Sequence, residues 1–412
     1  MSIADQRTDA EEITTGPAGT RGRRRRAALI ATPLLVVGVA LAATNLRPAV
    51  TSMASVLGEV RDDLGASTAW ISVLTAVPTV CFGLAAIAAP WLGRRLGAGR
   101  AIALALAVLT AGLVLRIVDG PWVVLGGTFV AAAGIAIGNV LIPAVVKESF
   151  PHAIGRITGI YTAGLAAGGG IGAALTPPME QLLGGWRGAV GAWAVLSAAA
   201  LVVWLLGARH GEDRGPVVAT AGTRRSMLRR PLAWVVTAFF GLQACVAYVA
   251  MGWLSELLFS EGVSRTDAGL MLALISLIGI PLSFVVPPIA LRQKSQSGWI
   301  VGLACCSLVA VLGLAVAPAA APWLWSVLLG VGMGVFPLGL GVIALRTREV
   351  SETTDLSAMA QGFGYLLGAG GPFLFGILYG ATGGWTASLM LLAAVIVAEM
   401  ALGWAAGRPR FV

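Results

Sequence analysis

Charged residues are scarce in this sequence, and their scarcity argues against a soluble fold. Only 11% of the 412 residues are Asp, Glu, Lys or Arg, whereas 57% are hydrophobic. The mean hydropathy is +0.87. A soluble domain would have to bury long uncharged runs in one core, which the scaling of domain size does not support. The composition therefore predicts a chain that lies in a lipid bilayer.

Histidine and cysteine are also rare, which argues against metal and redox chemistry. The two histidines, His152 and His210, lie in polar loops, and the four cysteines lie in apolar segments without zinc-type spacing. We expect no metal, no cofactor and no disulfide. An intramembrane enzyme would need a metal site or a nucleophile and base at depth, and the apolar segments contain no histidine and no paired acids. The sequence does not predict an enzyme.

Twelve apolar segments are each long enough to cross a bilayer. They extend approximately over 28–58, 68–91, 100–118, 121–146, 155–178, 186–208, 232–257, 266–290, 297–317, 322–345, 357–379 and 385–406. The polar stretch 209–231 divides them six and six, and short motifs recur in the same order at an offset of roughly 200 residues. Gly134 to Gly138, for example, matches Gly330 to Gly334.

Two six-helix halves related by a parallel repeat predict the major facilitator fold, an all-α membrane protein with twelve transmembrane helices. We expect five parts in the chain. They are a disordered basic cytoplasmic tail (1–27), an N-terminal six-helix half (28–208), a cytoplasmic linker (209–231), a C-terminal six-helix half (232–406) and a cytoplasmic tail (407–412).

Lysine and arginine are distributed unevenly between the two sides of the predicted membrane. With the N-terminus inside, 23 of the 28 fall in the tails and the even-numbered loops. Four fall in the odd-numbered loops, Arg61, Arg116, Arg187 and Arg265, and the remaining one is Arg47. This bias predicts a multi-pass protein of the cell membrane with both termini in the cytoplasm. It also accounts for the net charge of +9 without nucleic acid as a partner.

Arg47 is the most informative residue because it lies deep in the first predicted span. The charges that bracket this span are Arg26 and Glu59, and a helix between them is about 48 Å long, with Arg47 about 7 Å from its midpoint. A guanidinium at that depth costs about 3 kcal/mol on insertion scales and keeps its charge, so it normally faces a water-filled solute path. Pro48 removes a backbone donor beside it. The alternative is an arginine that snorkels to the headgroups or forms a structural pair.

Several stretches carry a family resemblance. They are Asn45-Leu46-Arg47-Pro48-Ala49, Gly138 to Lys147, Phe150-Pro151, Thr158 to Thr162, Gly241-Leu242-Gln243, Tyr248, Trp253-Leu254, Leu356 to Gln361, Gly364-Tyr365-Leu366 and Gly383-Gly384-Trp385. With these motifs, which extend over nearly the whole chain after residue 28, the sequence resembles the cyanate and 2-nitroimidazole transporter (CynX/NimT) family of the major facilitator superfamily. It departs from the superfamily at Gly93 to Gly97, where the basic loop after span 2 lacks the usual acidic residue.

The resemblance implies secondary active transport of a small anionic or nitrogen-rich solute, cyanate-like or nitroimidazole-like, by alternating access. The expected partners are this solute, the lipid bilayer and a coupling proton or counter-ion. Multidrug-type efflux of neutral or cationic compounds is the first alternative, and it predicts an acidic cavity. A non-transporting membrane receptor is a remote alternative, because the central polar stretch is too short for a signalling domain.

Polar side chains within the spans are the candidates for solute contacts. Arg47 is the predicted anchor, and the other candidates are Asn45, Thr51, Asn139, Tyr161, Gln243, Tyr248, Gln361 and Tyr365. A buried amide such as Asn139 must find partners in lipid, so it either contacts solute or ties helices together. For a tyrosine, the alternative is a place in the aromatic belt at the membrane interface.

Two residues are candidates for gating or coupling, and one set for helix packing. Lys147 is predicted either to gate the inner side or to snorkel, and Glu399, in span 12, either couples transport to protons or forms a structural contact. The glycine-rich spans 5 and 11 predict close helix contact, with a proline that could form a hinge. The residues of this packing set are Gly164, Gly168, Gly364, Gly368 and Pro372.

Overall fold

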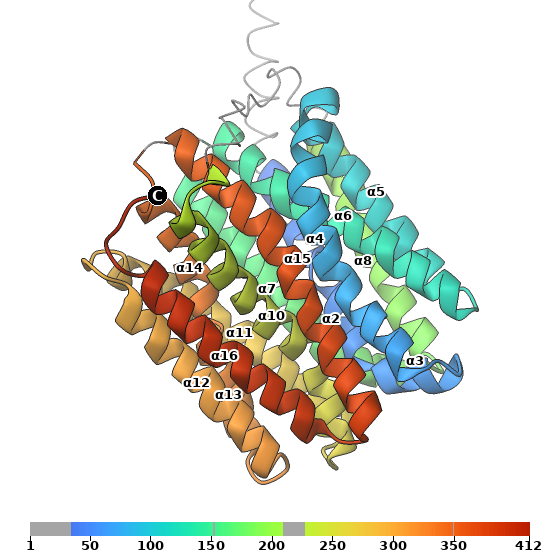
Figure 1. Ribbon diagram of the computed structural model, residues 1–412. Helices are drawn as coiled ribbons and strands as arrows, with labels where there is room; N and C mark the ends of the chain where they lie inside the picture. The colour runs from blue at the N-terminus through green and yellow to red at the C-terminus, as the bar shows by residue number, and fades with distance from the viewer. Residues whose placement is uncertain (1–33, 151–152, 209–226, 349) are drawn as a thin grey trace, which may run out of the picture.

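The chain folds into a bundle of long antiparallel helices, as Figure 1 shows. The computed structural model describes residues 34–150, 153–208, 227–348 and 350–412, so the expected tail 1–27 and most of the linker 209–231 lie outside the described residues. A helical segment over 34–45 comes first. It is followed by α2 (Pro48–Ser55), α3 (Leu57–Asp63), α4 (Thr68–Leu96), α5 (Ala98–Leu115), α6 (Pro121–Ser149), α7 (Ile154–Leu182), α8 (Trp186–Ala208), α10 (Pro231–Ser260), α11 (Arg265–Ala290), α12 (Ser297–Val316), α13 (Pro322–Gly332), α14 (Val335–Leu345), α15 (Val350–Thr382) and α16 (Trp385–Ala406).

Eleven helical stretches in the described residues are long and apolar enough to cross a membrane. The remaining predicted span is the fifth, 155–178, which corresponds to α7; this helix has 29 residues and is therefore also long enough. Its many glycines, among them Gly168, Gly169 and Gly170, have no side chain to add to its hydropathy. The all-α membrane fold is thus confirmed, with α7 as the span that composition alone marks least clearly.

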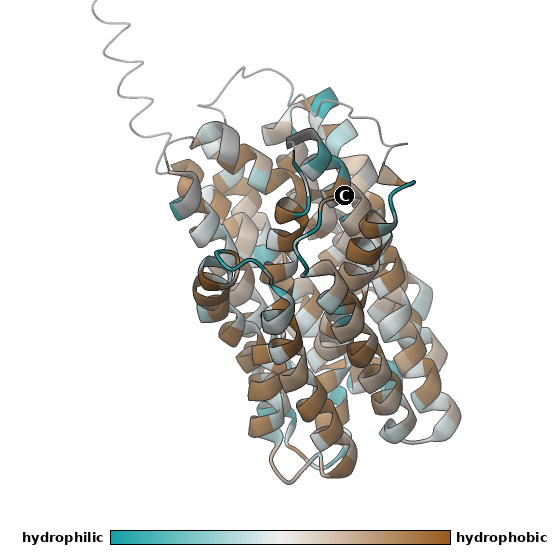
Figure 2. Ribbon diagram, turned by 60° about the vertical axis from the view of Figure 1, so that its left-hand side comes forward, coloured by the Kyte–Doolittle hydropathy of each residue, from teal (hydrophilic) through white to brown (hydrophobic). Residues whose placement is uncertain are grey.

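The sides of the bundle are apolar, as expected for contact with lipid. Large hydrophobic side chains such as Val195 and Val316 are 73% and 86% exposed. In Figure 2 hydrophobic residues run along the lengths of the helices, whereas hydrophilic residues gather in connections near the C-terminus. Such an exposed apolar surface would be unfavourable in water and is favourable in a bilayer.

Two spans are interrupted near the middle of the bundle. The first span turns at Leu46 and Arg47 before α2 begins at Pro48, which cannot donate a backbone hydrogen bond. Another span is divided at Met333 and Gly334 between α13 and α14. Both interruptions lie beside the same cavity, since Arg47 and Met333 are among the residues that line it.

The helices before and after residues 209–226 form two sets that meet along a central seam. We call the described residues 34–208 the N-terminal half and 227–412 the C-terminal half. At one flank of Figure 1 α5 packs on α6 and α8, and at the other α12 packs on α13 and α16. Across the seam α4 packs on α15, α7 on α11 and α2 on α10.

The two ends of the bundle differ in the segments that they carry. The α3 end carries α3 and the connections 183–185 and 261–264, which join α7 to α8 and α10 to α11. The C-terminal end carries the last residues of α4, the first residues of α15 and the chain terminus at Val412.

Candidate functional site

A cavity of about 170 Å³ lies on the seam between the two halves. It is lined from the N-terminal half by Arg47 and by residues of α7, and from the C-terminal half by residues of α10, α11, α14 and α15 and by Met333. Cavities between helices of a bundle are common ligand sites, and in transporters with repeated halves the solute lies near the middle of the membrane between the repeats.

Arg47 is the one charged residue among those that line the cavity. The turn that precedes α2 directs its side chain across the seam, where Nη1 lies 3.0 Å from the Sδ atom of Met251 in α10. A thioether is a weak acceptor and carries no charge. In the described part of the chain no carboxylate forms a salt bridge with Arg47, so its positive charge remains available to an anion.

Aromatic rings form the wall of the cavity on the side of α10 and α15. Tyr248 and Tyr365 lie edge to face with their ring centroids 6.3 Å apart, and Tyr365 also contacts Phe240 at 5.4 Å. Phe82 of α4 packs on both tyrosines, and Phe336 joins Phe240 from α14. Such rings offer flat apolar faces, and the two phenols can donate or accept hydrogen bonds.

Small polar groups line the opposite wall, on α7 and α11. Thr162 and Ser276 line the cavity, as does Ser283, whose hydroxyl donates to the carbonyl of Gly279 at 2.7 Å. Gly169 keeps this wall open, because a Cβ there would lie 3.1 Å from the Ser276 hydroxyl and 3.5 Å from the Cβ of Arg47. The cavity thus combines one positive charge, a face of aromatic rings and hydroxyl groups.

Two predicted neighbours of Arg47 have their side chains engaged elsewhere. The Asn45 amide donates to the carbonyls of Leu41 at 2.8 Å and Leu196 at 3.4 Å. The Thr51 hydroxyl donates to the carbonyl of Arg47 at 3.3 Å and is fully buried. Neither is among the residues that line the cavity, and both side chains donate to backbone carbonyls instead.

Asn139 and Tyr161 form a pair that links α6 to α7. The Tyr161 hydroxyl donates to Asn139 Oδ1 at 3.2 Å, and neither side chain lines the cavity. This contact matches the helix-tying alternative for Asn139. The hydrogen bond uses the Oδ1 atom of Asn139 and not its amide nitrogen.

The two predicted glutamines also lie outside the cavity lining. Gln243 is 2% exposed in α10, and its Nε2 lies 4.0 Å from the Sδ atom of Met333. Gln361 donates to the Ser357 hydroxyl one turn earlier in α15, at 2.9 Å. Gln361 and Tyr365 share a helix face, as their spacing predicts, but only Tyr365 reaches the cavity.

Of the two predicted gating and coupling residues, Glu399 has a described side chain, and it does not line the cavity. Lys147 is in the last turn of α6, and its side chain lies outside the described part of the structure. Glu399 of α16 is 1% exposed, and its Oε1 atom has no hydrogen-bond partner among the described residues.

The predicted packing glycines lie where two helices approach closely. A Cβ at Gly168 would lie 2.0 Å from the carbonyl oxygen of Thr44, and one at Gly164 would lie 3.1 Å from that of Ala40. Gly364 and Gly368 face α10 in the same way, with a would-be Cβ within 3.3 Å of its backbone.

Pro372, the last residue of the predicted packing set, is inside α15. Its carbonyl accepts a hydrogen bond from Trp253 Nε1 of α10 at 3.0 Å.

Several residues of interest have no clear signal in the sequence. Met251, Phe336 and Ser276 line the cavity, yet they are ordinary residues of apolar spans. Arg116, which sequence reasoning places in a loop, is 1% exposed and donates to the carbonyl of Ala49 at 2.6 Å. The scarcity of Lys and Arg in the odd-numbered loops is the signal that could have marked it.

Among the described residues, no cluster of three or more His, Cys, Asp or Glu side chains is placed so that it could hold a metal ion.

Comparisons with known proteins agree with a helical bundle that encloses a cavity between two halves. The model of the Major Facilitator Superfamily matches residues 39–372. The chain is 35% identical to the 2-nitroimidazole transporter of Escherichia coli (strain K12), over 92% of this chain and 96% of that protein. It is 27% identical to the cyanate transport protein CynX of the same organism, over 85% and 91%.

Among solved structures, the fold is similar to that of a bacterial homologue of the human lysosomal transporter Spinster, in an inward-facing and unoccupied conformation. The TM-score is 0.74 at 16% identity, and the match covers 92% of this chain and 97% of the other. At this identity the likeness concerns the fold alone.

Proposed function

Because the chain belongs to the major facilitator superfamily, in its cyanate and 2-nitroimidazole transporter branch, we propose that it carries a small anionic or nitrogen-rich solute by alternating access. It is a membrane transporter rather than an enzyme.

The observation that carries the proposal is the isolated charge of Arg47 in the cavity. A guanidinium costs about 3 kcal/mol at the centre of a bilayer, and such a residue is retained where it has a function. Its neighbour within hydrogen-bond distance is the thioether of Met251. An anion or a polarised nitro group would give Arg47 the bidentate partner that the protein does not supply.

The remaining lining selects the shape of the solute. Tyr248, Tyr365 and Phe336 present flat faces, which suit a planar ring or a linear unsaturated anion better than a branched aliphatic one. A cavity of about 170 Å³ suits a small molecule. Efflux of cationic drugs is disfavoured, because no carboxylate is among the described residues that line this cavity.

The position of the cavity supports alternating access. Its lining on α7, from Thr162 to Gly169, comes from the half of that helix nearer the C-terminal end. On α11, the lining residues extend from Ile275, near the middle of the helix, to Ser283, which is nearer the same end of the bundle. The C-terminal end is the cytoplasmic side in our proposal, since the Lys and Arg bias places it there.

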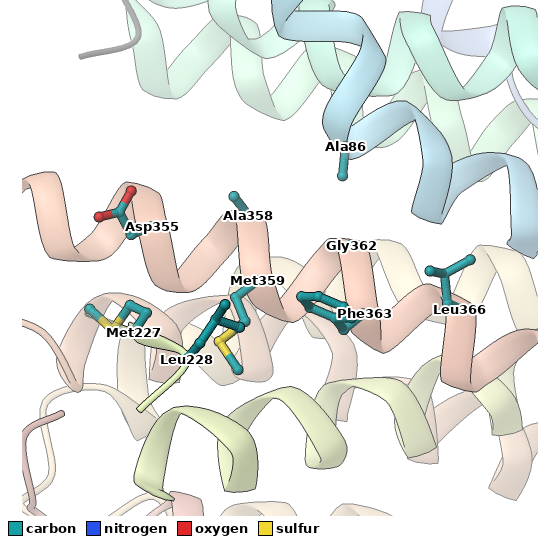
Figure 3. A pocket seen from close by; sticks show the side chains of 9 residues that line it. All are labelled: Ala86, Met227, Leu228, Asp355, Ala358, Met359, Gly362, Phe363 and Leu366. Carbon is teal, nitrogen blue, oxygen red and sulfur yellow. The ribbon is translucent and has the colours of Figure 1, made fainter. Parts of the chain in front are cut away.

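A second pocket lies at that same end, lined by Ala86 of the N-terminal half and by eight residues of the C-terminal half. Figure 3 shows Ala86 of α4 facing α15 across a gap, with Ala358, Gly362 and Leu366 along the opposite helix. Closer to the α3 end the same two helices pack more tightly: a Cβ at Gly83 would lie 2.7 Å from the Leu366 side chain, whereas a Cβ at Gly362 would lie 3.8 Å from the Ala86 Cβ. This arrangement favours a cytoplasm-facing state, one of the two states that alternating access requires.

The proposal is tested by ligand binding to the purified protein in detergent. Thermal unfolding and equilibrium binding are measured with cyanate, nitrate, nitrite, small carboxylates and 2-nitroimidazole at constant ionic strength. In Arg47→Gln we expect at least about tenfold weaker binding, since a hydrogen bond to a charged group contributes about 1.5–3 kcal/mol. The control Arg95→Gln removes an exposed guanidinium that stacks on Trp91 at the C-terminal end, and it should bind like the wild type.

Either outcome of this test is informative. Stabilisation by anions that is lost in Arg47→Gln and kept in Arg95→Gln supports Arg47 as the anchor. Equal binding in wild type and Arg47→Gln would return Arg47 to a structural role. Binding of neutral or cationic compounds that persists in Arg47→Gln would favour efflux.

A further inference from the structure

An ion cluster joins the two halves at the α3 end. Arg265, the first residue of α11, donates from Nη2 to Oε1 of Glu59 in α3 at 2.7 Å and from Nη1 to Oε2 of Glu256 in α10 at 3.0 Å. We call these three residues the α3-end cluster. The side chains of Arg265 and Glu256 are only 13% and 8% exposed, whereas that of Glu59 is 29% exposed. The cluster is therefore largely shielded from solvent screening.

The contact with Glu59 crosses the seam. Glu59 belongs to the N-terminal half, while Arg265 and Glu256 belong to the C-terminal half. The halves approach closely here, because a Cβ at Gly58 would lie 2.9 Å from Glu256 and 3.0 Å from Arg265. A change of access that opens this end must separate Glu59 from the other two.

At the C-terminal end the described ion pairs stay within one half. Arg230 pairs with Glu352 at 2.9 Å, and both lie in the C-terminal half. The Arg346 guanidinium binds Gln296 and the carbonyls of Ala406 and Gly407, again in that half. Among the described residues, the salt bridge between halves is thus found at the α3 end, where the halves also approach closely at Gly58.

The α3-end cluster contains more negative than positive charge. Two carboxylates share one guanidinium, and Oε2 of Glu59 and Nε of Arg265 are buried without a hydrogen-bond partner in the described part of the chain. Glu180, from α7, adds a third carboxylate that acts on Glu59. On α3 itself Arg61 is the neighbouring cation, and it pairs with the exposed Asp62.

Glu59 is the member of the cluster whose surroundings disfavour a negative charge. Burial raises the pKa of Glu59 to about 7, although the guanidinium of Arg265 opposes this change. The carboxylates of Glu180 and Glu256 raise the pKa further. A proton on Glu59 leaves Arg265 paired with Glu256, so protonation does not leave the guanidinium without a counter-charge.

We infer that Glu59 is a proton-binding site whose occupancy controls closure of the α3 end. The inference rests on the proposed alternating access. It assigns proton binding to a residue at the contact between the two halves, whereas Glu399 is buried in α16 and no carboxylate is among the described residues that line the cavity. In the open state water would solvate Glu59, and the carboxyl would return toward its ordinary acidity.

The direction of the effect follows from linkage. A carboxyl that binds protons more tightly in the closed state stabilises that state as the pH falls through about 7, and this stabilisation is lost as the pH rises above it. The ratio of closed to open molecules should rise about tenfold between pH 8.5 and pH 6. Acid on the proposed outer side would therefore hold the α3 end shut.

The test measures opening directly and needs no solute. Spin labels are placed at Leu182→Cys, 83% exposed at the end of α7, and at Glu261→Cys, exposed after α10, with the four native cysteines replaced. Distance distributions across the α3 end are recorded in lipid nanodiscs from pH 5.5 to 9. We compare Glu59→Gln, a neutral isostere, with Asp63→Asn.

Asp63 provides a matched control because it lies one turn beyond Glu59 on α3 and pairs within its own half. Its carboxylate binds Arg187 and accepts from Trp186 Nε1 at 3.1 Å, and these contacts hold its pKa below the ordinary value. As the pH falls, the distances between the labels should shift toward shorter values in the wild type and, to the same extent, in Asp63→Asn. Glu59→Gln should show short distances at every pH.

Three results would overturn the inference. They are a pH-independent distribution in the wild type, an unchanged pH response in Glu59→Gln, and an α3 end that never opens. Only the last also contradicts alternating access, and none bears on solute binding at Arg47, so failure of this inference and failure of the proposed function can be told apart.

Discussion

At the scale of single residues, the pair of Tyr161 and Asn139 can be separated from the cavity by mutation. We expect Tyr161→Phe to lower the free energy of unfolding by about 1 kcal/mol, because it removes one hydrogen bond between α6 and α7. Solute affinity should not change, since neither residue lines the cavity. Thermal unfolding and binding of the same preparation check both statements. A loss of affinity with unchanged stability would instead make Tyr161 a solute contact.

Residue type carries much of this information in the sequence, but side-chain direction does not. An arginine deep in an apolar span stands out by its cost alone, and the structure brings Arg47 together with Tyr248 and Tyr365 at the cavity. Asn45 and Thr51 look equally suitable in the sequence. Their amide and hydroxyl groups bond the backbone around the break, and only the folded structure shows that preference.

At the scale of helices, Gly168 sets how closely α7 approaches the first span. We expect Gly168→Ala to destabilise the protein by about 1–3 kcal/mol, because its Cβ would lie 2.0 Å from the carbonyl oxygen of Thr44 and a backbone atom cannot move aside. Gly126→Ala in α6 is the control. Nothing lies within 4 Å of its would-be Cβ, so it should leave stability unchanged or raise it by up to about 1 kcal/mol.

Thermal unfolding in detergent distinguishes these two glycines. A Gly168→Ala protein as stable as the wild type would mean that α7 and the first span can separate without cost, and the packing prediction would then be wrong.

The sequence predicts where helices lie better than where they break. The interruption before α2 is visible because Pro48 lacks a backbone donor. The interruption at Met333 and Gly334 has no comparable marker, since a glycine in an apolar span more often indicates packing. The α3-end cluster is hidden for another reason. Its three members lie in separate segments, and each reads as an ordinary charge at the end of a span.

At the scale of the whole molecule, the fold follows from hydropathy and from the repeat of six and six spans. The major facilitator fold is confirmed by the family match and by the helical bundle. The orientation stays a prediction from the 23 Lys and Arg placed in the tails and even-numbered loops.

Reporter fusions test that orientation. A fluorescent protein joined after Val412 should fold and fluoresce, and a phosphatase that needs an oxidising compartment should be inactive at the same point. Joined after Gly262, between α10 and α11, the phosphatase should be active. The opposite pattern would reverse the two sides of the membrane, and with them the side from which acid acts on Glu59.

The pocket of Figure 3 has a consequence for the whole transport cycle. Among its nine lining residues only Asp355 is charged, so closing the C-terminal end over this gap would expel water from apolar surface. That driving force weakens on cooling, whereas the ionic contact at the α3 end is largely shielded from salt. Cold should therefore keep the C-terminal end open. The balance between the two states would register the temperature around the cell.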